Sequence, residues 1–394
     1  MAQPKGLIRA AVVLVLVGIA AVGVRALLRG DEGGPRVQAT MTVAEAMGGD
    51  TTGYLRAIEP RRFSFPEDHG PHHGYRHEWW YFTGNLETAE GRRFGYQLTF
   101  FRSALTAEPE DRESAWGASD AYMAHFALTD AAGNRFYAFD RFARDAVGLA
   151  GARAEPFLVH VEDWEAKAVG MTAFPARLRA ADGEVAIDLV VDQGKAPVLQ
   201  GDDGLSRKGS EVGNASYYYS LTRMPTEGMI RVGGREYHVR GTSWMDREWG
   251  TSALGPEQVG WDWFSLQLSD GSELVFFELR RSDGTRDPHD YAAVVAPDGS
   301  KRNLAAGAVR LEVLDTWASP LDGIRYPSRW RVLIPDERID LIVTPVLADQ
   351  ELDVAVRYWE GAVDVTGESA GHPVTGRGYV ELTGYGDEPE GPRR

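Results

Sequence analysis

The sequence predicts an all-β fold that contains two related β-barrel domains. Six Asp-Gly pairs punctuate the chain, and this dipeptide suits the tight turns that connect antiparallel strands. They begin at Asp182, Asp203, Asp270, Asp283, Asp298 and Asp322. Between the turns, aromatic and β-branched residues alternate with polar ones, as in strands with one face in water. No segment after the N-terminal region carries a long apolar stripe at helical spacing, so antiparallel meanders are expected instead of βαβ units.

A repeated aromatic hairpin indicates that the two barrels are related. Residues Trp79–Leu86 align with Trp261–Leu268, and a turn follows each segment. After the turn, Tyr96–Arg102 aligns with Glu273–Arg280 once the register is adjusted by one residue. Two copies of one device in a single chain predict duplicated structural units. The alternative is a chance similarity between two aromatic strands.

The N-terminus is expected to lie outside the barrels. Lys5 and Arg9 precede an unbroken apolar run from Ala10 to Val24, which is typical of a signal peptide or a membrane anchor. We expect an uncleaved anchor that holds the body outside the cytoplasm, in the periplasm or at the cell surface, with cleavage as the alternative. The predicted divisions are a signal or anchor (1–29), a linker (30–50), an N-terminal barrel (51–226), a C-terminal barrel (227–386) and a disordered tail (387–394). The barrel boundary falls at a turn-rich break near Met224–Gly228.

Composition excludes several classes of function. The chain of 394 residues has a net charge of −16 and no cysteine. The acidic balance argues against binding to nucleic acid, because phosphate backbones would be repelled. The lack of cysteine excludes disulfides, thiolate nucleophiles and Cys-based metal sites. No nucleotide-binding signature and no Gly-x-Ser-x-Gly elbow is present, so neither a cofactor nor a serine hydrolase is expected.

Charged residues and tryptophans are concentrated in Gly241–Gly250 and Gly260–Leu268. This mixture predicts an aromatic-walled pocket with a few positioned polar groups. Strand parity puts Asp262 on a face with Phe264 and Leu266, and an Asp on an apolar face needs a partner or a raised pKa. Asp262 is therefore the first candidate for a general acid, and a salt bridge to Arg247 is the structural alternative.

Three further carboxyl groups are candidates for acid–base work. Asp246 and Glu248 lie two residues apart, on one strand face with Trp244, so they could hold one proton between them. The alternative is an ion-pair cluster with Arg247. Glu78, beside Trp80, is a lesser candidate in the first barrel.

Histidines gather in a Gly/Pro-rich loop at His69, His72, His73 and His77. Their spacing matches no standard metal site, so no metal is predicted. A site formed by His69, His73 and His77 is the less favoured alternative to a loop that hydrogen-bonds at the mouth of a barrel.

Several segments, taken in order, carry a family resemblance. They are His77–Leu86, Gly95–Arg102, Ala124–Asp130, Trp244–Gly250, Gly260–Leu268, Tyr358–Ala362 and Gly378–Gly384. The chain resembles AttH-like proteins and carotenoid 1,2-hydratases (hydroxyneurosporene synthases), and it is most similar to the secreted AttH-like branch. The resemblance covers roughly residues 54–385.

The resemblance implies two lipocalin-like (calycin-type) antiparallel β-barrels side by side. It also implies the addition of water to an isolated double bond of an acyclic carotenoid, or a role beside an ABC-type exporter. One position departs from the family pattern, because Arg247 stands where His is common, and arginine stays protonated in proteins. The expected pocket residues are Trp79, Trp80, Tyr81, His125, Trp244, Arg247, Trp249, Trp261 and Trp263.

Two functions therefore remain open. The first is a cofactor-free hydro-lyase in which a carboxylic acid protonates a C=C bond of an apolar, isoprenoid or lipid-like ligand. Aromatic faces would stabilise the cation formed in that step. The second is a non-catalytic carrier that takes a lipid or polyene from an ABC-type exporter in the membrane.

Overall fold

The computed structural model describes residues 50–108, 114–252, 254–255 and 257–386. The predicted anchor, the linker up to residue 49 and the predicted tail lie outside these residues. The described residues form β-strands with two short 3-10 helices, η1 (Glu67–His69) and η2 (Pro335–Glu337). In this described part of the chain, no helix is long and apolar enough to cross a membrane. The predicted all-β class is confirmed.

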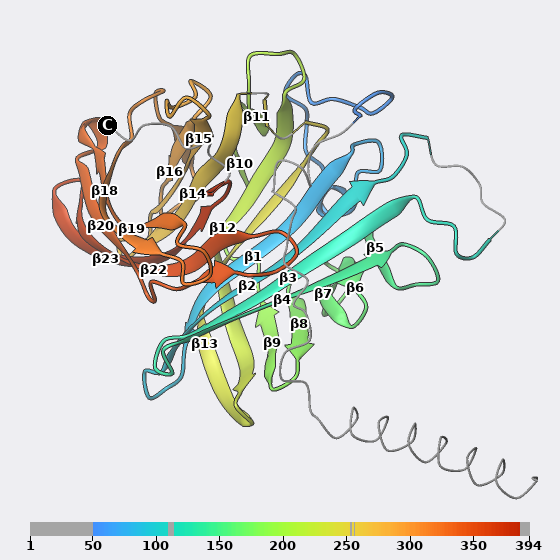
Figure 1. Ribbon diagram of the computed structural model, residues 1–394, viewed down its shortest axis with the longest axis horizontal. Helices are drawn as coiled ribbons and strands as arrows, with labels where there is room; N and C mark the ends of the chain where they lie inside the picture. The colour runs from blue at the N-terminus through green and yellow to red at the C-terminus, as the bar shows by residue number, and fades with distance from the viewer. Residues whose placement is uncertain (1–49, 109–113, 253, 256, 387–394) are drawn as a thin grey trace, which may run out of the picture. The chain divides into compact units, whose positions relative to one another are not determined.

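The strands form two antiparallel, barrel-like sheets (Figure 1). In spatial order, the first contains β4 (Arg135–Arg144), β3 (Asp120–Asp130), β2 (Arg93–Ala104), β1 (His77–Glu87), β13 (Arg235–Gly250), β12 (Ala215–Val232), β9 (Val185–Val191), β8 (Ala176–Asp182), β7 (Trp164–Ala168), β6 (Leu158–Val161) and β5 (Ala150–Arg153). Two short strands, β10 (Val198–Leu199) and β11 (Leu205–Arg207), pair with β12. The outer strand β4 lies against β5 and β6, so this sheet curls back on itself.

The second sheet repeats the same order on a smaller scale. It contains β17 (Lys301–Asn303), β16 (Tyr291–Val295), β15 (Glu273–Arg281), β14 (Gln258–Leu268), β23 (His372–Leu382), β22 (Tyr358–Ser369), β20 (Ile339–Pro345), β19 (Arg325–Ile334) and β18 (Arg310–Ala318), and β21 (Glu351–Leu352) pairs with β22. In each sheet, the strand that comes first in the sequence pairs with the next strand and with the last one: β1 pairs with β2 and β13, and β14 pairs with β15 and β23. This shared order agrees with the predicted repeat, since β1–β2 and β14–β15 are its two aromatic hairpins.

The turn residues account for much of this connectivity. All six glycines of the Asp-Gly pairs have φ between +50° and +93°, a region that glycine enters without a steric cost. Five of the six pairs lie between strands that pair with each other, as the hairpin prediction requires. Asp203-Gly204 is the exception, because it lies between β10 and β11, which both pair with β12.

Along the chain, the first sheet ends at Gly250 and the second begins at Gln258, so the change of sheet does not fall at residue 226. The turn-rich break expected near Met224–Gly228 lies inside β12, which continues to Val232 with a register shift between Leu221 and Met224. An irregularity of this kind accommodates a proline within a sheet. The residues that suggested a break therefore mark a bulge, and the first sheet extends further along the chain than the predicted 51–226.

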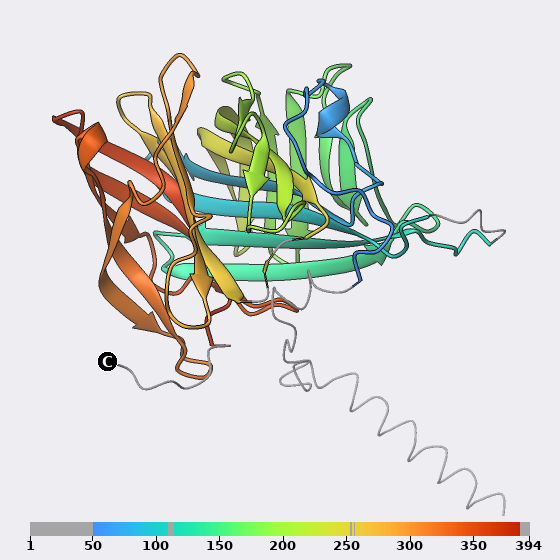
Figure 2. The same cartoon turned by 90° about the horizontal axis from the view of Figure 1, so that it is seen from above.

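Buried apolar side chains fill the inside of each curled sheet and also pack between the two sheets. The side chains between the sheets include Tyr81 and Trp244 from the first sheet and Trp263 and Tyr379 from the second. Gly95 permits a close approach, because a Cβ at this position would lie 2.6 Å from the Cβ of Ala362. Figure 2 shows the two sheets side by side from above.

Candidate functional site

A cavity of about 140 Å³ lies between the two sheets, and both sheets contribute side chains to it. Its aromatic walls include Trp79, Tyr81, Phe101, Trp261, Trp263 and Phe277. Its polar groups include His125, Lys208, Tyr218, Asp246, Glu248, Tyr358 and Glu381. An apolar space with a few polar groups is typical of a small-molecule site, so we take this cavity as the candidate site.

Asp246 lies in the wall formed by β13 and is 4% exposed. Its Oδ1 accepts hydrogen bonds from Ser220 Oγ and Trp244 Nε1, both at 2.6 Å, and its Oδ2 accepts one from Tyr218 OH at 2.6 Å. Burial raises the pKa of Asp246 to about 7, although these three donors oppose the rise. The carboxyl therefore changes protonation near neutral pH, which suits a general acid or base.

Glu248 lies on the same face of β13 but has a cationic partner. Its Oε1 is 3.1 Å from Lys208 Nζ and accepts a hydrogen bond from Ser216 Oγ. The predicted shared face of Asp246, Glu248 and Trp244 is thus present, since Trp244 bonds Asp246 directly. The two carboxyl groups therefore have different surroundings: Glu248 is paired with a cation, whereas Asp246 accepts hydrogen bonds from neutral donors.

Arg247 points to the opposite face of β13, away from this pair. It forms an ion pair with Glu78 and donates to Gly70 O at 2.5 Å. Its guanidinium carbon lies 3.9 Å from the centre of the Trp80 ring. The ion pairs expected for Arg247 do not form. Asp262 pairs with Arg280 instead, and Arg247 bonds the backbone oxygen of Glu248 and not its carboxylate.

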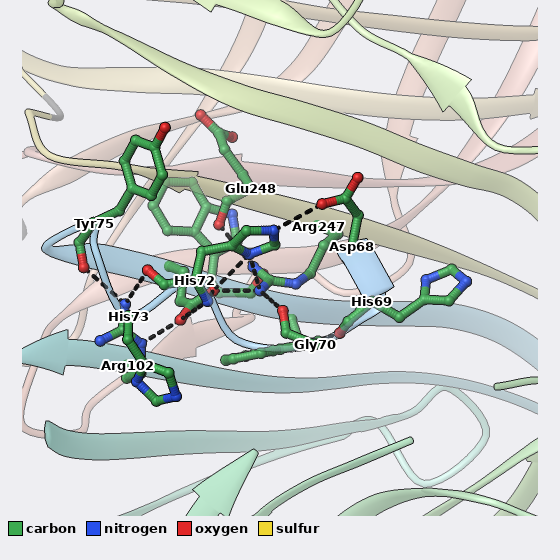
Figure 3. A network of polar contacts seen from close by, with 12 residues as sticks. Asp68, His69, Gly70, His72, His73, Tyr75, Arg102, Arg247 and Glu248 are labelled. Atoms are coloured by element: carbon green, nitrogen blue, oxygen red, sulfur yellow. Dashed lines mark hydrogen bonds and ion pairs between the residues drawn. The ribbon is translucent and has the colours of Figure 1, made fainter. Parts of the chain in front are cut away.

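Glu78 is buried and forms ion pairs with both Arg102 and Arg247. Figure 3 shows these two arginines together with Gly70, His72 and Tyr75 of the same network. Burial alone would raise the pKa of Glu78, but Arg247 and Arg102 hold this pKa well below its ordinary value. Arg102 also bonds Asp120 at 2.6 Å and the backbone oxygen of Tyr75 at 2.8 Å. A carboxylate fixed by two arginines is a structural anion, so Glu78 does not have the state required of a proton donor.

Of the loop histidines, His72 and His73 bond members of this network, whereas His69 and His77 bond residues outside it. His69 Nδ1 lies 2.6 Å from Tyr219 OH, His73 Nδ1 lies 3.1 Å from Asp120, and His77 Nδ1 lies 3.1 Å from Ser103 Oγ. Among the residues that the structure describes, no group of three His, Asp or Glu side chains has a metal-binding arrangement. The less favoured metal site at His69, His73 and His77 is therefore not assembled.

Asp262 does not line the cavity. Its predicted strand face is correct, but that face lies on the inner side of the second sheet, with Phe264 and Leu266. Arg280 Nε lies 3.0 Å from Asp262 Oδ1, and Tyr385 OH donates at 2.8 Å to Oδ2. The cavity lies on the other face of β14, with Trp261 and Trp263. Asp262 is consequently a structural clamp for the C-terminal end of the body.

The other expected pocket residues divide between the cavity and the core. Trp79, Tyr81, His125, Trp261 and Trp263 line the cavity, whereas Trp80, Trp244, Arg247 and Trp249 do not. His125 is fully buried, its Nδ1 lies 2.8 Å from Tyr358 OH, and burial lowers its pKa to about 3. It is therefore neutral at physiological pH. Trp249 stacks on His72 with a ring separation of 3.7 Å.

Sequence reasoning missed Glu381, Tyr218, Tyr358 and Lys208, all of which line the cavity. Glu381 lies within Gly378–Gly384 and Tyr358 within Tyr358–Ala362, segments that had carried only the family resemblance. Strand parity would have placed the Glu381 side chain on the other face of its strand from those of Val380 and Leu382. The pairing of β14 with β23, which brings Glu381 beside Trp263, could not be read from local sequence.

Comparison with known proteins agrees with this architecture. The pattern of AttH-like proteins matches residues 56–385. The chain belongs to the AttH-like family. A solved structure from Nitrosomonas europaea, assigned as an AttH, is 34% identical with a TM-score of 0.74 and covers 84% of this chain and 99% of its own.

More distant relatives include hydratases and a dehydratase. The structure of kievitone hydratase from Nectria haematococca has a TM-score of 0.65 at 17% identity, covering 85% of this chain and 97% of its own, which shows a shared fold. Dehydratase asqC of Emericella nidulans is 24% identical over 224 residues, and kievitone hydratase of Fusarium solani subsp. phaseoli is 25% identical over 217. Each match covers 52% of this chain and spans about three fifths of the relative's own length.

Proposed function

We propose that this protein binds an apolar ligand between its two sheets and adds water to, or removes water from, a C=C bond of that ligand. The observation that carries the proposal is Asp246, a carboxyl with a pKa raised to about 7 in the wall of an aromatic cavity. The hydratase and dehydratase names of the distant relatives support the same class of reaction.

The chemistry needs few groups. A neutral carboxylic acid protonates one carbon of the double bond, and a cation forms at the other carbon. Aromatic faces such as those of Trp79, Trp261 and Trp263 stabilise that cation, and water then adds to it. A carboxyl that titrates near neutral pH has the proton affinity that such a step requires. No cofactor takes part in the proposed reaction.

An isoprenoid or other lipid-like alkene is the ligand class that we propose. The support is the apolar wall together with the resemblance to carotenoid 1,2-hydratases. The competing function, a lipid or polyene carrier beside an ABC-type exporter, uses the same cavity without needing a titrating acid. The raised pKa of Asp246 therefore favours the enzyme.

The test compares Asp246→Asn with Asp262→Asn in the full chain, using lycopene and squalene in detergent micelles as acyclic polyene probes. Asn can neither donate nor accept a proton as a carboxyl group does, so we expect Asp246→Asn to lower the rate of hydration about 10²–10⁴-fold. Asp262→Asn should retain the rate, because Asp262 lies outside the cavity. The measurement is alcohol product by mass spectrometry with ¹⁸O-water. Tight binding of a probe with no labelled product from the unchanged protein would favour the carrier.

We also propose that the N-terminal segment places the body outside the cytoplasm, where an apolar ligand would come from the adjacent membrane. The support is the run from Ala10 to Val24 after Lys5 and Arg9. Cell fractionation of the full chain tests this proposal, and recovery of the protein in the cytosol would contradict it.

A further inference from the structure

The repeat brings two carboxyl groups to equivalent places. Tyr81 in the first hairpin aligns with Trp263 in the second. Asp246 is the β13 residue directly opposite Tyr81, and Glu381 is the β23 residue directly opposite Trp263. The two aromatic rings meet edge to face, with their centres 5.2 Å apart. Asp246 and Glu381 therefore occupy equivalent positions in the two copies of the repeat.

Both counterparts line the same cavity. Glu381 Oε2 accepts a hydrogen bond from Trp261 Nε1 at 3.1 Å, and this is the side-chain hydrogen bond that the structure gives to Glu381. Its side chain is partly accessible because it faces the open space. One carboxyl therefore reaches the ligand space from each sheet.

We propose that Glu381 is a second catalytic residue of this cavity, and that it and Asp246 act as a proton donor and a proton acceptor on opposite walls. This inference rests on the proposed function, and it adds a residue and a direction of proton transfer to it.

The hydrogen bonds of the two carboxyl groups indicate which one donates the proton and which one accepts it. Among the residues that the structure describes, Asp246 accepts from three donors, Ser220, Trp244 and Tyr218, whereas Glu381 accepts from one, Trp261. Donors stabilise the anion, so the pair's last proton lies on Glu381 and Asp246 is the carboxylate. Burial raises the pKa of Glu381 to about 7, as it does for Asp246, and the charges of Asp246 and Glu248 add to the rise at Glu381. Two coupled acids of this kind hold one proton near neutral pH.

The groups around Glu381 preserve this state. Glu360, directly opposite it on β22, is fully buried, accepts a hydrogen bond from Tyr81 OH at 2.6 Å and has a pKa raised well above its ordinary value by burial and by Glu381. It is therefore neutral. Tyr81 and Tyr358 are neutral as well, because burial raises the pKa of each. Lys208, a cation in the cavity wall, pairs with Glu248.

The proposed step balances. The proton of Glu381 forms a C–H bond with the π electron pair of the alkene, and a cation remains at the neighbouring carbon. Water donates a lone pair to that carbon, and Asp246 accepts the proton that the new oxonium releases. The products are an alcohol, a Glu381 carboxylate and a neutral Asp246. Proton exchange through water in the cavity returns the proton to Glu381, and dehydration follows the same path in reverse.

The first experiment needs no ligand. Infrared titration of the full chain from pH 5 to pH 9 records the C=O band of neutral carboxyl groups. Glu381→Gln should remove one component that ionises near pH 7, and Asp246→Asn should move that component to lower pH because a neighbouring charge is lost. The matched control is Glu278→Gln. Burial raises the pKa of Glu278 to about 7, but this residue lies outside the cavity. Persistence of every component in Glu381→Gln would overturn the proposal.

The second experiment measures turnover of lycopene and squalene in deuterated water. We expect Glu381→Gln to reduce deuterium transfer to carbon about 10²–10⁴-fold while the dissociation constant for the probe changes little, and Glu278→Gln to match the unchanged protein. Full turnover in Glu381→Gln would refute the role of Glu381. Absence of turnover in the unchanged protein would instead count against the proposed function, and the infrared titration would still decide whether the two acids are coupled.

Discussion

Arg247 is a buried side chain whose charge is balanced on the far side of the strand from the cavity. Its partners are Glu78, the backbone oxygen of Gly70 and the face of Trp80. This placement accounts for arginine at a position where the family often has histidine, because the proposed reaction does not need Arg247 to transfer a proton. Its planar, always-charged group suits a site where a carboxylate, carbonyls and a ring must be satisfied together.

At this scale we predict that Arg247→Lys lowers the free energy of unfolding by about 3 kcal/mol, since the ammonium cannot satisfy the same partners and Glu78 stays buried. Urea denaturation at pH 7 measures the change. The matched control is Arg331→Lys, at an ion pair with Asp340 that is about two-fifths exposed, where the substitution should change the free energy of unfolding little because water screens the pair. Equal effects of the two substitutions would contradict the role given to Arg247.

At the scale of elements, one buried carboxylate joins the second hairpin to the first sheet. Glu273 on β15 is fully buried and pairs with Lys195, between β9 and β10, at 2.7 Å and with Arg223 on β12 at 2.5 Å. Lys195 and Arg223 also donate to backbone oxygens near the β14–β15 turn. These bonds fix the position of β14, which provides Trp261 and Trp263 to the cavity from the same face of the sheet as Glu273.

We therefore predict that Glu273→Ala destabilises the body by about 3–5 kcal/mol, the usual cost of removing one partner from a buried ion pair. Loss of the link should also separate unfolding into two steps, one for each sheet, when tryptophan fluorescence and circular dichroism are followed together. Asp340→Asn, at a half-exposed pair within the second sheet, is the control and should keep a single transition. A single transition of unchanged midpoint in Glu273→Ala would show that the link is dispensable.

For the molecule as a whole, local sequence was sufficient for the strands but not for their partners. Alternation and Asp-Gly turns predicted the all-β class, and the aromatic repeat agrees with the two matching sheet orders. Parity also placed Asp262 on the correct face of β14, yet which face meets the other sheet depends on long-range packing. For the same reason Asp246 was found and Glu381 was missed, because the pairing of β23 with β14 joins residues more than 100 positions apart.

The acids of the cavity predict an unusual pH dependence of stability. Asp246 and Glu381 have pKa values raised to about 7, so the folded chain retains protons that the unfolded chain releases between about pH 4 and pH 7. The free energy of unfolding should fall as pH rises through this range, and Glu278 and Glu360, whose pKa values are also raised, add to the fall. Glu78 acts in the opposite sense, because its lowered pKa gives stability that is lost as pH falls below about 4.

Stability should consequently be greatest near pH 5, and the Asp246→Asn, Glu381→Gln double variant should lose much of the decline toward pH 8. Both substituted side chains remain neutral, so the cost of burying their charges disappears. The gain at pH 8 should be on the order of 3 kcal/mol relative to the unchanged chain, and it should vanish near pH 4, where the acids are protonated in both. Urea unfolding at pH 4, 5, 6, 7 and 8 measures it. A constant offset between the two chains at every pH would mean that these carboxyl groups do not titrate near neutrality, and the acid–base chemistry assigned to the cavity would then lack its proton.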